Sequence, residues 1–423
     1  MAEAAVAAGG RGARAGRPLL PAVAWRNLWR NGRRTWLTAG GIAFTVFLIV
    51  FSMSFQRGAY VQMIDNATAL LSGHLQIQNR HYVEDKRVEQ TVADVSRLVN
   101  RLEGQPGVES VAPRVEAFAL VSAGERAFGA QVLGVDPERE RRTVRFFDRV
   151  AEGRMIEGMT DAVVGEVLAS NLGIGVGGEI VLLGTGKEGG VAALALDVVG
   201  VFRTGIPDLD RAMVAAPLAM VRDAFGLGDE AHTLVVRSAE VTESARLERQ
   251  LDDWLPAPLI ARNWDEVMPD IRQGIEIDRI GGYFVYGLIA IVVIFSVVNS
   301  FIMTVFERTR EFGMLRAIGM RPGRIVLMVQ IEAAFVWVLG AAIGLALALP
   351  IVLWLQVYGF YLGDEVASMV ESMYVPARLH TRMTPVALGL APAVMLVGTQ
   401  IAALIPSLKI RRLQPVTALR AEE

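Results

Sequence analysis

Three glycines have the spacing of a dinucleotide-binding loop. Gly173, Gly175 and Gly178 match G-x-G-x-x-G, and Asp197 follows about 20 residues later, where such a site places its ribose-binding carboxylate. That chemistry requires the glycines to follow a strand and open a helix, because the helix N-terminus binds the pyrophosphate. Residues 163–184 have the reverse order of helix, turn and strand, which predicts a plain turn without a nucleotide.

Other reactive or metal-binding arrangements are missing from the sequence. Residues 184–190, GTGKEGG, lack both the spacing of a phosphate-binding loop and the Ser or Thr that should follow Lys187. The chain has no cysteine, no G-x-S-x-G and no H-E-x-x-H. Its histidines have no metal-ligand spacing, which predicts packing or surface roles for His74, His81, His232 and His380. The sequence therefore predicts that this chain is not an enzyme and binds no cofactor or metal itself.

Hydrophobicity defines the elements that surround these residues. Of the 423 residues 52% are hydrophobic, and the mean hydropathy is +0.39. Four stretches of 22, 27, 31 and 26 residues carry no charge, and each exceeds the roughly 20 residues that cross a bilayer as a helix. They predict transmembrane helices at 35–56, 283–306, 325–357 and 385–408. The first is too long for the apolar core of a signal peptide and lacks a cleavage site, so we expect a permanent anchor.

Basic and acidic residues are sorted between the segments that flank these spans. Residues 1–34, 307–324 and 409–423 together hold 16 basic and 5 acidic side chains, whereas residues 57–282 hold 24 basic and 35 acidic ones. Short cytoplasmic loops retain Lys and Arg, so both termini and loop 307–324 are expected in the cytoplasm. Residues 57–282 and the loop 358–384 are then expected outside it.

The segment before the first span has the pattern of an interfacial helix. Its sequence AWRNLWRNGRRTW places Trp25, Trp29 and Trp36 at helical spacing, with four arginines on other faces. Indoles favour the headgroup region and arginines contact anionic lipid, so an amphipathic helix in the membrane surface is expected within residues 1–34. A solvated basic stub is the alternative.

The insertion at 57–282 reads as a mixed α+β domain on two helical stalks. Residues 58–71 can continue the first span, and residues 264–280 can lead into the second. Between them, alternating stretches predict strands, and amphipathic stretches at 94–102 and 245–255 predict helices. The predicted fold class is four membrane helices with a large α+β domain between the first two.

The segment FERTREFGMLRAIGMRPGRI, residues 306–325, has the features of a short helix with a defined end. Two i,i+3 pairs can stabilise it, Glu307 with Arg310 and Arg308 with Glu311. Gly319 suits the C-cap of this helix, and Pro322 suits the first turn of the next. The expected product is a charged helix beside the membrane that can pass its movement to spans two and three.

The same helix is predicted to expose an apolar edge to the cytoplasm. Phe312, Leu315 and Ile318 recur at intervals of three residues. Such an edge can dock in a groove of a partner protein. The alternative is an ordinary cytoplasmic loop without a docking role, because the positive-inside rule alone would account for its arginines.

One carboxylate and two glycines stand out in the third span. Glu332 is about 12 Å from Arg324 along a helix, a depth that permits snorkelling or pairing with an arginine. Structural anchoring is therefore favoured over transport chemistry for Glu332. Gly340 and Gly344 form a small-xxx-small face for close helix packing, either within the subunit or between two subunits.

Several of these motifs resemble one group of permeases. ERTREFGMLRAIGMRPGRI, the following IEAAFVWVLGAAIGLALAL and the closing PSLKIRRLQPVTALR are similar to permease subunits of the LolC/LolE and MacB/FtsX families of ABC transporters. AWRNLWRNGRRTWLT and VVGEVLASNLGIGVGGEIVLL look closest to LolE-like permeases. The resemblance extends from Ala24 to Arg420. MacB-type chains carry a fused nucleotide-binding domain and this sequence contains none, so ATP hydrolysis is expected in another polypeptide.

The resemblance implies a permease of the bacterial inner membrane that works as a homo- or heterodimer with a cytoplasmic ATPase dimer, which would bind ATP and Mg²⁺. Membrane lipids and a periplasmic partner or lipoprotein carrier are the other implied contacts, and no nucleic acid is expected. The helix that couples to the ATPase would contain Glu307, Arg308, Arg310, Glu311, Phe312, Gly313, Leu315, Arg316 and Gly319.

Three functions remain open from the sequence. The leading hypothesis is mechanical work on a lipoprotein or other amphiphile at the outer face of the membrane, as in lipoprotein release. FtsX-like mechanotransmission, which activates a periplasmic enzyme without transport, is the second, and a tethered binding domain without an ATPase is the third. The spans contain few polar residues, so no hydrophilic solute is expected to cross. A lipid-anchored substrate would enter between spans one and two, near Phe51, Phe55, Tyr283 and Tyr286.

Overall fold

The structure is a computed structural model that describes residues 19–366 and 376–410. The chain divides into two compact units. The helical unit comprises residues 1–57, 278–359 and 380–423, and the inserted domain comprises residues 58–277 and 360–379. The part of the closing motif PSLKIRRLQPVTALR that follows residue 410 lies outside the described residues.

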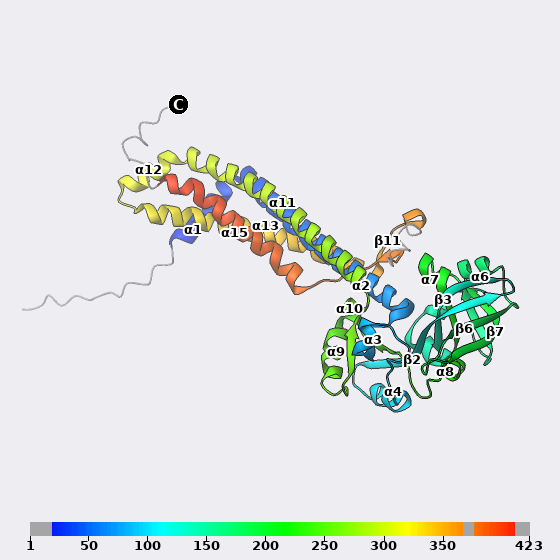
Figure 1. Ribbon diagram of the computed structural model, residues 1–423. Helices are drawn as coiled ribbons and strands as arrows, with labels where there is room; N and C mark the ends of the chain where they lie inside the picture. The colour runs from blue at the N-terminus through cyan, green and yellow to red at the C-terminus, as the bar shows by residue number, and fades with distance from the viewer. Residues whose placement is uncertain (1–18, 367–375, 411–423) are drawn as a thin grey trace, which may run out of the picture. The chain divides into compact units, whose positions relative to one another are not determined.

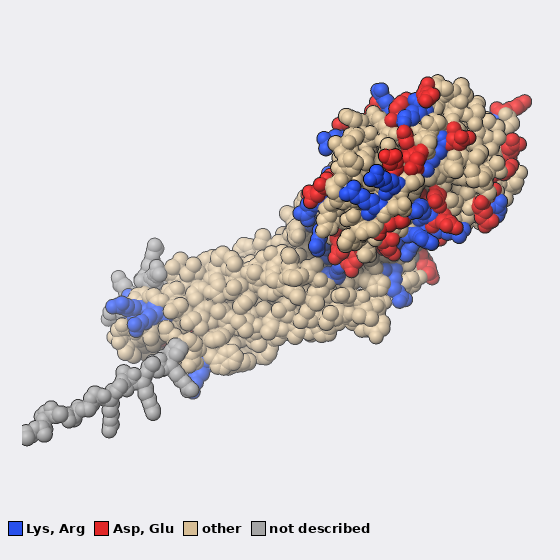
Figure 2. All heavy atoms as spheres, turned by 90° about the horizontal axis from the view of Figure 1, so that it is seen from below, with Lys and Arg blue, Asp and Glu red and all other residues tan. Residues whose placement is uncertain are grey.

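Four long helices have the length and apolarity to cross a membrane, and each contains one of the predicted spans. They are α2 (Gly32–Ala67), α11 (Pro269–Glu307), α13 (Pro322–Tyr358) and α15 (Pro385–Ile410). Figure 1 shows the four running alongside one another. On the face shown in Figure 2, the bundle surface between its ends is almost free of charged side chains.

The close packing of α2 against α13 depends on two glycines. A Cβ added to Gly340 would lie 2.8 Å from the Ala39 carbonyl oxygen, and one added to Gly344 would lie 2.6 Å from the Ala43 carbonyl oxygen. Only residues without a side chain allow the two backbones to approach this closely. The small-residue face of α13 therefore packs against α2 of the same subunit.

Two breaks shape the connection between α11 and α13. α11 ends at Glu307, Arg308 leaves helical geometry with φ −100° and ψ 13°, and α12 runs from Thr309 to Ala317. Gly319 has a φ of +95°, a region that favours glycine, and Pro322 begins α13. The stop and start signals lie where the sequence predicts them. Glu307, however, belongs to α11 and not to the loop helix.

Six strands of the inserted domain pair in a closed ring. β2 (Val108–Ala123) pairs with β3 (Arg126–Val135), and further pairs lead through β8 (Met213–Pro217), β5 (Asp161–Gly165), β7 (Val191–Phe202) and β6 (Glu179–Thr185) back to β2. Alternate residues of β2 and β7 point into a core that also includes residues of α6 (Glu166–Leu172) and α8 (Leu218–Phe225). Closure satisfies the strand edges that an open sheet would expose.

The long strand β2 also carries a second part of the sheet. Beyond it follow β9 (Thr233–Ser238), β1 (Leu75–Asn79) and β10 (Leu259–Asn263), all paired antiparallel. α4 (Val95–Glu103) and α9 (Ser244–Asp252) contribute Val99, Leu102 and Leu251 to the core beside these strands. The sheet therefore has two cores, one inside the ring and one beneath its extension.

Short elements complete the described chain. They are α1 (Leu19–Arg30), the π-helical turn η1 (Thr68–Ser72), α3 (Arg80–Glu84), α5 (Pro137–Thr143), η2 (Phe146–Arg149), β4 (Val150–Gly153), α7 (Pro207–Ala212), η3 (Val241–Glu243), α10 (Trp264–Val267), β11 (Phe360–Tyr361) and β12 (Arg378–Leu379).

The predicted fold class is confirmed, and so are most local expectations for the insertion. The predicted helices at 94–102 and 245–255 correspond to α4 and α9. Gly173 ends α6 with a φ of +73°, which is the helix-to-strand turn expected in place of a nucleotide site. Short strands such as β5 and β8 were not predicted, because five residues give little periodicity. The second stalk expected at 264–280 is helical, as α10 and the first part of α11, with a break at Met268 between the two helices.

Candidate functional site

A cluster of charged side chains joins the loop helix α12 to the neighbouring helices of the helical unit. Its centre is Glu332 on α13, which is only 5% exposed. The Glu332 carboxylate accepts hydrogen bonds from Arg308 Nη1 at 2.9 and 3.1 Å and from Asn27 Nδ2 on α1 at 2.7 Å. Three segments that are distant in the sequence therefore meet on one carboxylate.

Glu311 on α12 extends this cluster toward α1. Its carboxylate accepts a hydrogen bond from Arg308 Nε at 3.0 Å and lies 2.5 Å from Arg30 Nη1. Burial would raise the pKa of Glu311, but the hydrogen bonds from Arg308 and Arg30 outweigh it and hold this pKa below its usual range. The predicted pair of Arg308 with Glu311 is thus present, and Arg308 also serves Glu332.

Glu307, at the end of α11, has a different partner from the predicted one. Both terminal nitrogens of Arg34, near the start of α2, donate to the Glu307 carboxylate at 2.6 and 2.7 Å. Arg34 also donates to the Thr304 hydroxyl. Arg310, which the helical spacing assigns to Glu307, is instead exposed. A bidentate pair between two helices is better oriented than an i,i+3 pair along one helix.

The cluster surrounds a polar hollow of about 280 Å³. Three arginines and three glutamates line it, together with small polar residues from α1, α2 and α11. Every one of these glutamates bonds an arginine, so the charges balance within the cluster. The arrangement therefore holds helices together and offers no excess charge to a free ion.

The burial of Arg308 and Glu332 makes their pair costly to separate. Their side chains are 12% and 7% exposed. Removing one member of a buried pair costs about 3–5 kcal/mol, because the remaining charge is left without a partner. By contrast, the more exposed pair of Arg30 with Glu311 is worth about 0.2–1 kcal/mol. The junction of α11 and α12 is thus fixed to α13 mainly through Arg308.

The apolar edge predicted for the loop helix is only partly exposed, and that prediction is corrected. Phe312 is fully buried, and the Arg308 guanidinium lies 5.1 Å from its ring centre. Leu315 is half-buried against the core of the helical unit, whereas Ile318 is 85% exposed. Gly313 is buried and Arg316 half-buried, so one side of α12 belongs to the core. The exposed side carries Arg310, Met314, Ile318 and Gly319.

At the opposite end of the helical unit, aromatic residues gather on α2 and α11. Phe51 stacks between Phe47 and Phe55 with ring centres 6.0 Å apart. On α11, Tyr283 meets Tyr286 edge-on, and the Tyr286 hydroxyl donates to Gln56 Oε1 on α2 at 3.2 Å. The four residues that the sequence predicts for substrate entry therefore lie on two helices that touch each other.

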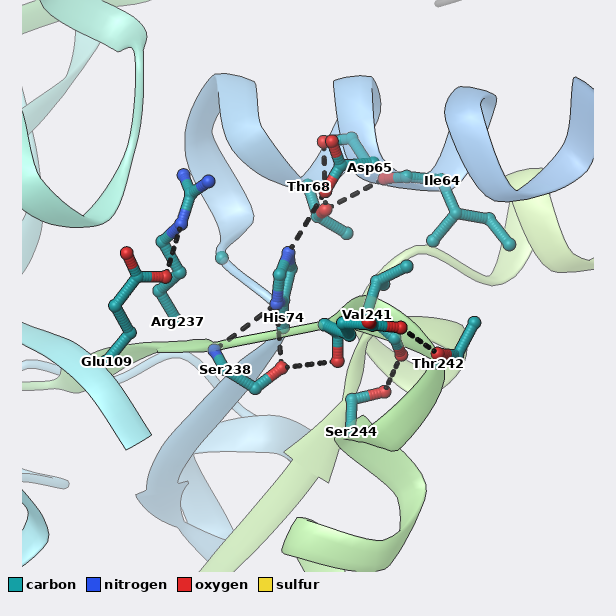
Figure 3. A network of polar contacts seen from close by, with 12 residues as sticks. Ile64, Asp65, Thr68, His74, Glu109, Arg237, Ser238, Val241, Thr242 and Ser244 are labelled. Carbon is teal, nitrogen blue, oxygen red and sulfur yellow. Dashed lines mark hydrogen bonds and ion pairs between the residues drawn. The ribbon is translucent and has the colours of Figure 1, made fainter. Parts of the chain in front are cut away.

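A second polar network lies in the inserted domain, where the stalk of α2 meets the sheet (Figure 3). The Ser238 backbone N–H donates to His74 Nδ1 at 3.2 Å, so the proton of a neutral His74 ring is on Nε2. Nε2 faces the Asp65 carboxylate at 3.5 Å. Ser238 Oγ lies 2.8 Å from the same ring, and this buried serine also donates to the Glu240 carbonyl oxygen at 2.9 Å. The network links the stalk to β9.

Further contacts fix the π-helical end of the first stalk. The Gly73 N–H donates to the Thr68 carbonyl oxygen, and a φ of +65° turns the chain into β1. Arg114, buried with Glu140, donates to the Leu71 carbonyl oxygen at 2.6 Å. The N–H of Trp264, the first residue of the second stalk, donates to the His74 carbonyl oxygen. Both stalks are therefore bonded to the start of β1.

Sequence reasoning missed the partners of the loop helix. Nothing in the spacing of residues 306–325 indicates that Arg30 and Arg34 would bind its carboxylates, or that Asn27 would bind the nearby Glu332. Glu332 was expected to pair with an arginine, and Arg308 is that arginine. Within residues 19–366 and 376–410, no group of three or more His, Cys, Asp or Glu side chains is arranged to hold a metal ion.

Residues 35–254 match the family described as MacB-like periplasmic core domain, and residues 283–415 match the FtsX-like permease C-terminal family. The first match covers just over half of the chain. The chain therefore belongs to the family of proteins with a MacB-like periplasmic core domain. It is an ABC-type permease of the Lol/MacB group and a membrane protein with four apolar helices.

Relatives named for lipoprotein release and for macrolide export both align with this permease. The transmembrane protein LolC of Neisseria meningitidis serogroup B is 24% identical over 93% of this chain and 96% of its own length. LolE of Haemophilus influenzae is 24% identical over 90% of this chain and 93% of its own. The ATP-binding/permease protein MacB of Shewanella sp. (strain ANA-3) is 26% identical over 84% of this chain, which spans 57% of that protein.

Proposed function

We propose that this permease couples ATP hydrolysis by a separate ATPase dimer to mechanical work on a lipoprotein or another amphiphile at the outer face of the bacterial inner membrane. The observation that carries this proposal is the loop helix α12. Glu311 on one side of it pairs with Arg30 of α1, and its N-cap residue Arg308 bonds Glu332 of α13, while Met314 and Ile318 remain exposed on the other side. An exposed helix that is fixed to membrane spans is suited to receive movement from a partner.

A substrate at the outer leaflet is supported by the character of the spans. Their exposed side chains are mainly apolar, and the aromatic residues of α2 and α11 offer stacking and hydroxyl groups to a lipid-anchored molecule. The relatives named as lipoprotein-releasing proteins agree with this substrate class. ATP and Mg²⁺ would be bound by the ATPase, and a second permease subunit would complete the dimer.

Photo-crosslinking in cells labelled with radioactive palmitate tests the proposal. A photoreactive amino acid at Phe55 or Tyr283 is expected to capture a palmitate-labelled, protease-sensitive partner, and capture should change when ATP is depleted. The same group at Val386, an exposed position on α15, is the matched control and should capture lipid without dependence on ATP.

The crosslinking result also distinguishes work on a lipoprotein from FtsX-like mechanotransmission. ATP-dependent transport of a small hydrophilic solute by reconstituted complex would overturn the proposal. Capture of no labelled protein, together with ATP-dependent protection of the inserted domain from protease, would favour FtsX-like mechanotransmission, which the match of residues 283–415 also supports.

A further inference from the structure

The helix α1 was expected to lie in the membrane surface, but one of its sides is docked on protein. Ala24 and Leu28 are buried, and the Trp25 ring meets Phe335 of α13 edge-on at 5.4 Å. Trp25 and Trp29 are still 48% and 44% exposed, so the indoles of α1 can also reach the headgroups. Apolar contacts therefore attach α1 to α13, in addition to the polar contacts of the cluster.

The polar residues of that docked side reach the loop helix. Asn27 lies about one turn from Ala24 and donates to Glu332, which also binds Arg308. Arg30 pairs with Glu311 on α12 itself. α1 is thus bonded twice to the carboxylates that hold the α11–α12 junction.

We propose that α1 is a positioning element of the coupling apparatus. Asn27 and Arg30, acting through Glu332 and Glu311, make α12 and the adjacent end of α13 move as one body with α1. The inference rests on the proposed function for the source of the movement. The contacts that join α1, α12 and the adjacent end of α13 do not depend on the proposed function.

The reason for joint movement lies in the burial of the shared charges. A swing of α12 alone would separate Arg308 from Glu332 and leave two charges with little access to water. Displacement of the whole body keeps these pairs intact and needs only the rearrangement of exposed contacts around it. The exposed indoles of α1 would then carry the displacement along the membrane surface.

Spin labels can test this in the cysteine-free chain. Labels at Val23 on α1 and Met314 on α12 occupy exposed positions outside the cluster. In purified full-length protein in lipid nanodiscs, we expect one narrow distance distribution. The double variant Asn27→Leu/Arg30→Glu should broaden it roughly two-fold, because both bonds from α1 are lost.

Two matched variants serve as controls. Arg26→Glu makes the same charge change on an exposed side of α1, and Arg30→Lys keeps the charge that Glu311 needs. Both should retain the narrow distribution. An unchanged distribution in the double variant, or equal broadening by Arg26→Glu, would overturn the inference without reference to any ATPase.

The complex with its ATPase provides the functional readout. The double variant should keep ATPase binding and basal hydrolysis but lose most of the nucleotide-dependent change in the inserted domain, whereas the wild-type distance between positions 23 and 314 should stay constant when ATP is bound. A wild-type distance that changes with ATP would contradict joint movement. Failure of any ATPase to co-purify would count against the proposed function and not against the body defined by the nanodisc experiment.

Discussion

Individual side chains in this permease show how burial decides the role of a titratable group. His232 is completely buried in the inserted domain, and both ring nitrogens are used. Nδ1 accepts the Glu116 backbone N–H at 3.0 Å, and Nε2 donates to the Val88 carbonyl oxygen at 3.0 Å. Burial lowers the pKa of His232 below 6.5, because a charged ring would lose water and one of its hydrogen bonds.

The stability of the inserted domain should therefore depend on pH. The unfolded chain binds a proton near pH 6.5, and the folded chain binds it only at lower pH. Stability is then fully present above 6.5 and falls by up to about 1.4 kcal/mol per pH unit below it. Hydrogen exchange of residues 111–118, corrected for intrinsic rates, should show this loss between pH 7.5 and 5. His232→Asn should reduce the dependence, and His81→Asn, at an exposed site, should not.

The packing of helices in the helical unit depends on glycines where two helix backbones approach each other closely. Gly344 faces α2 so closely that an added Cβ would also lie 2.9 Å from Val46 Cβ. Gly287 on α11 has no heavy atom within 4 Å of the same position. Both residues are helical, so the two sites differ only in their surroundings.

Substitution of each glycine by alanine raises helix propensity at both sites but creates a steric clash only at Gly344. Gly344→Ala is expected to destabilise the helical unit by about 1–3 kcal/mol, because α2 and α13 must move apart. Gly287→Ala should be neutral or stabilising by up to about 1 kcal/mol. Thermal unfolding of the full-length protein in detergent measures both. If the two variants behaved alike, the contact between α2 and α13 would not be the reason for the glycine.

At the scale of the whole molecule, the distribution of charge defines an orientation that labelling can check. Val191 in the inserted domain and Ile318 after α12 are 83% and 85% exposed. Single cysteines at these positions are unique, because the chain has none of its own. In intact spheroplasts, an impermeant maleimide should label Val191→Cys and spare Ile318→Cys, since basic loops are retained in the cytoplasm.

Lysed and detergent-denatured spheroplasts provide the control for this experiment. Both cysteines should react there, which excludes shielding by a bound partner as the cause of poor labelling at position 318. The reverse pattern in intact spheroplasts would refute the proposed location of the termini and of the loop helix. It would also leave no cytoplasmic surface on α12 for an ATPase.

The sequence by itself determined the four spans, the α+β character of the insertion, the C-terminal end of the loop helix and the turn at Gly173. Each of these depends on composition, periodicity or a local backbone preference, so no distant partner is needed to infer it. The long uncharged stretches are the clearest example, because their length alone suits a membrane.

Only the tertiary structure decided the partners of the charged residues and the closure of the β-ring. Asn27 and Glu332 are separated by 305 positions, and nothing in either segment specifies the other. The burial of Phe312 likewise follows from packing of α12 on the helical unit, although its spacing suggested an exposed edge. A local pattern shows that a helix has two faces, but the neighbours that cover one of them are set by the fold.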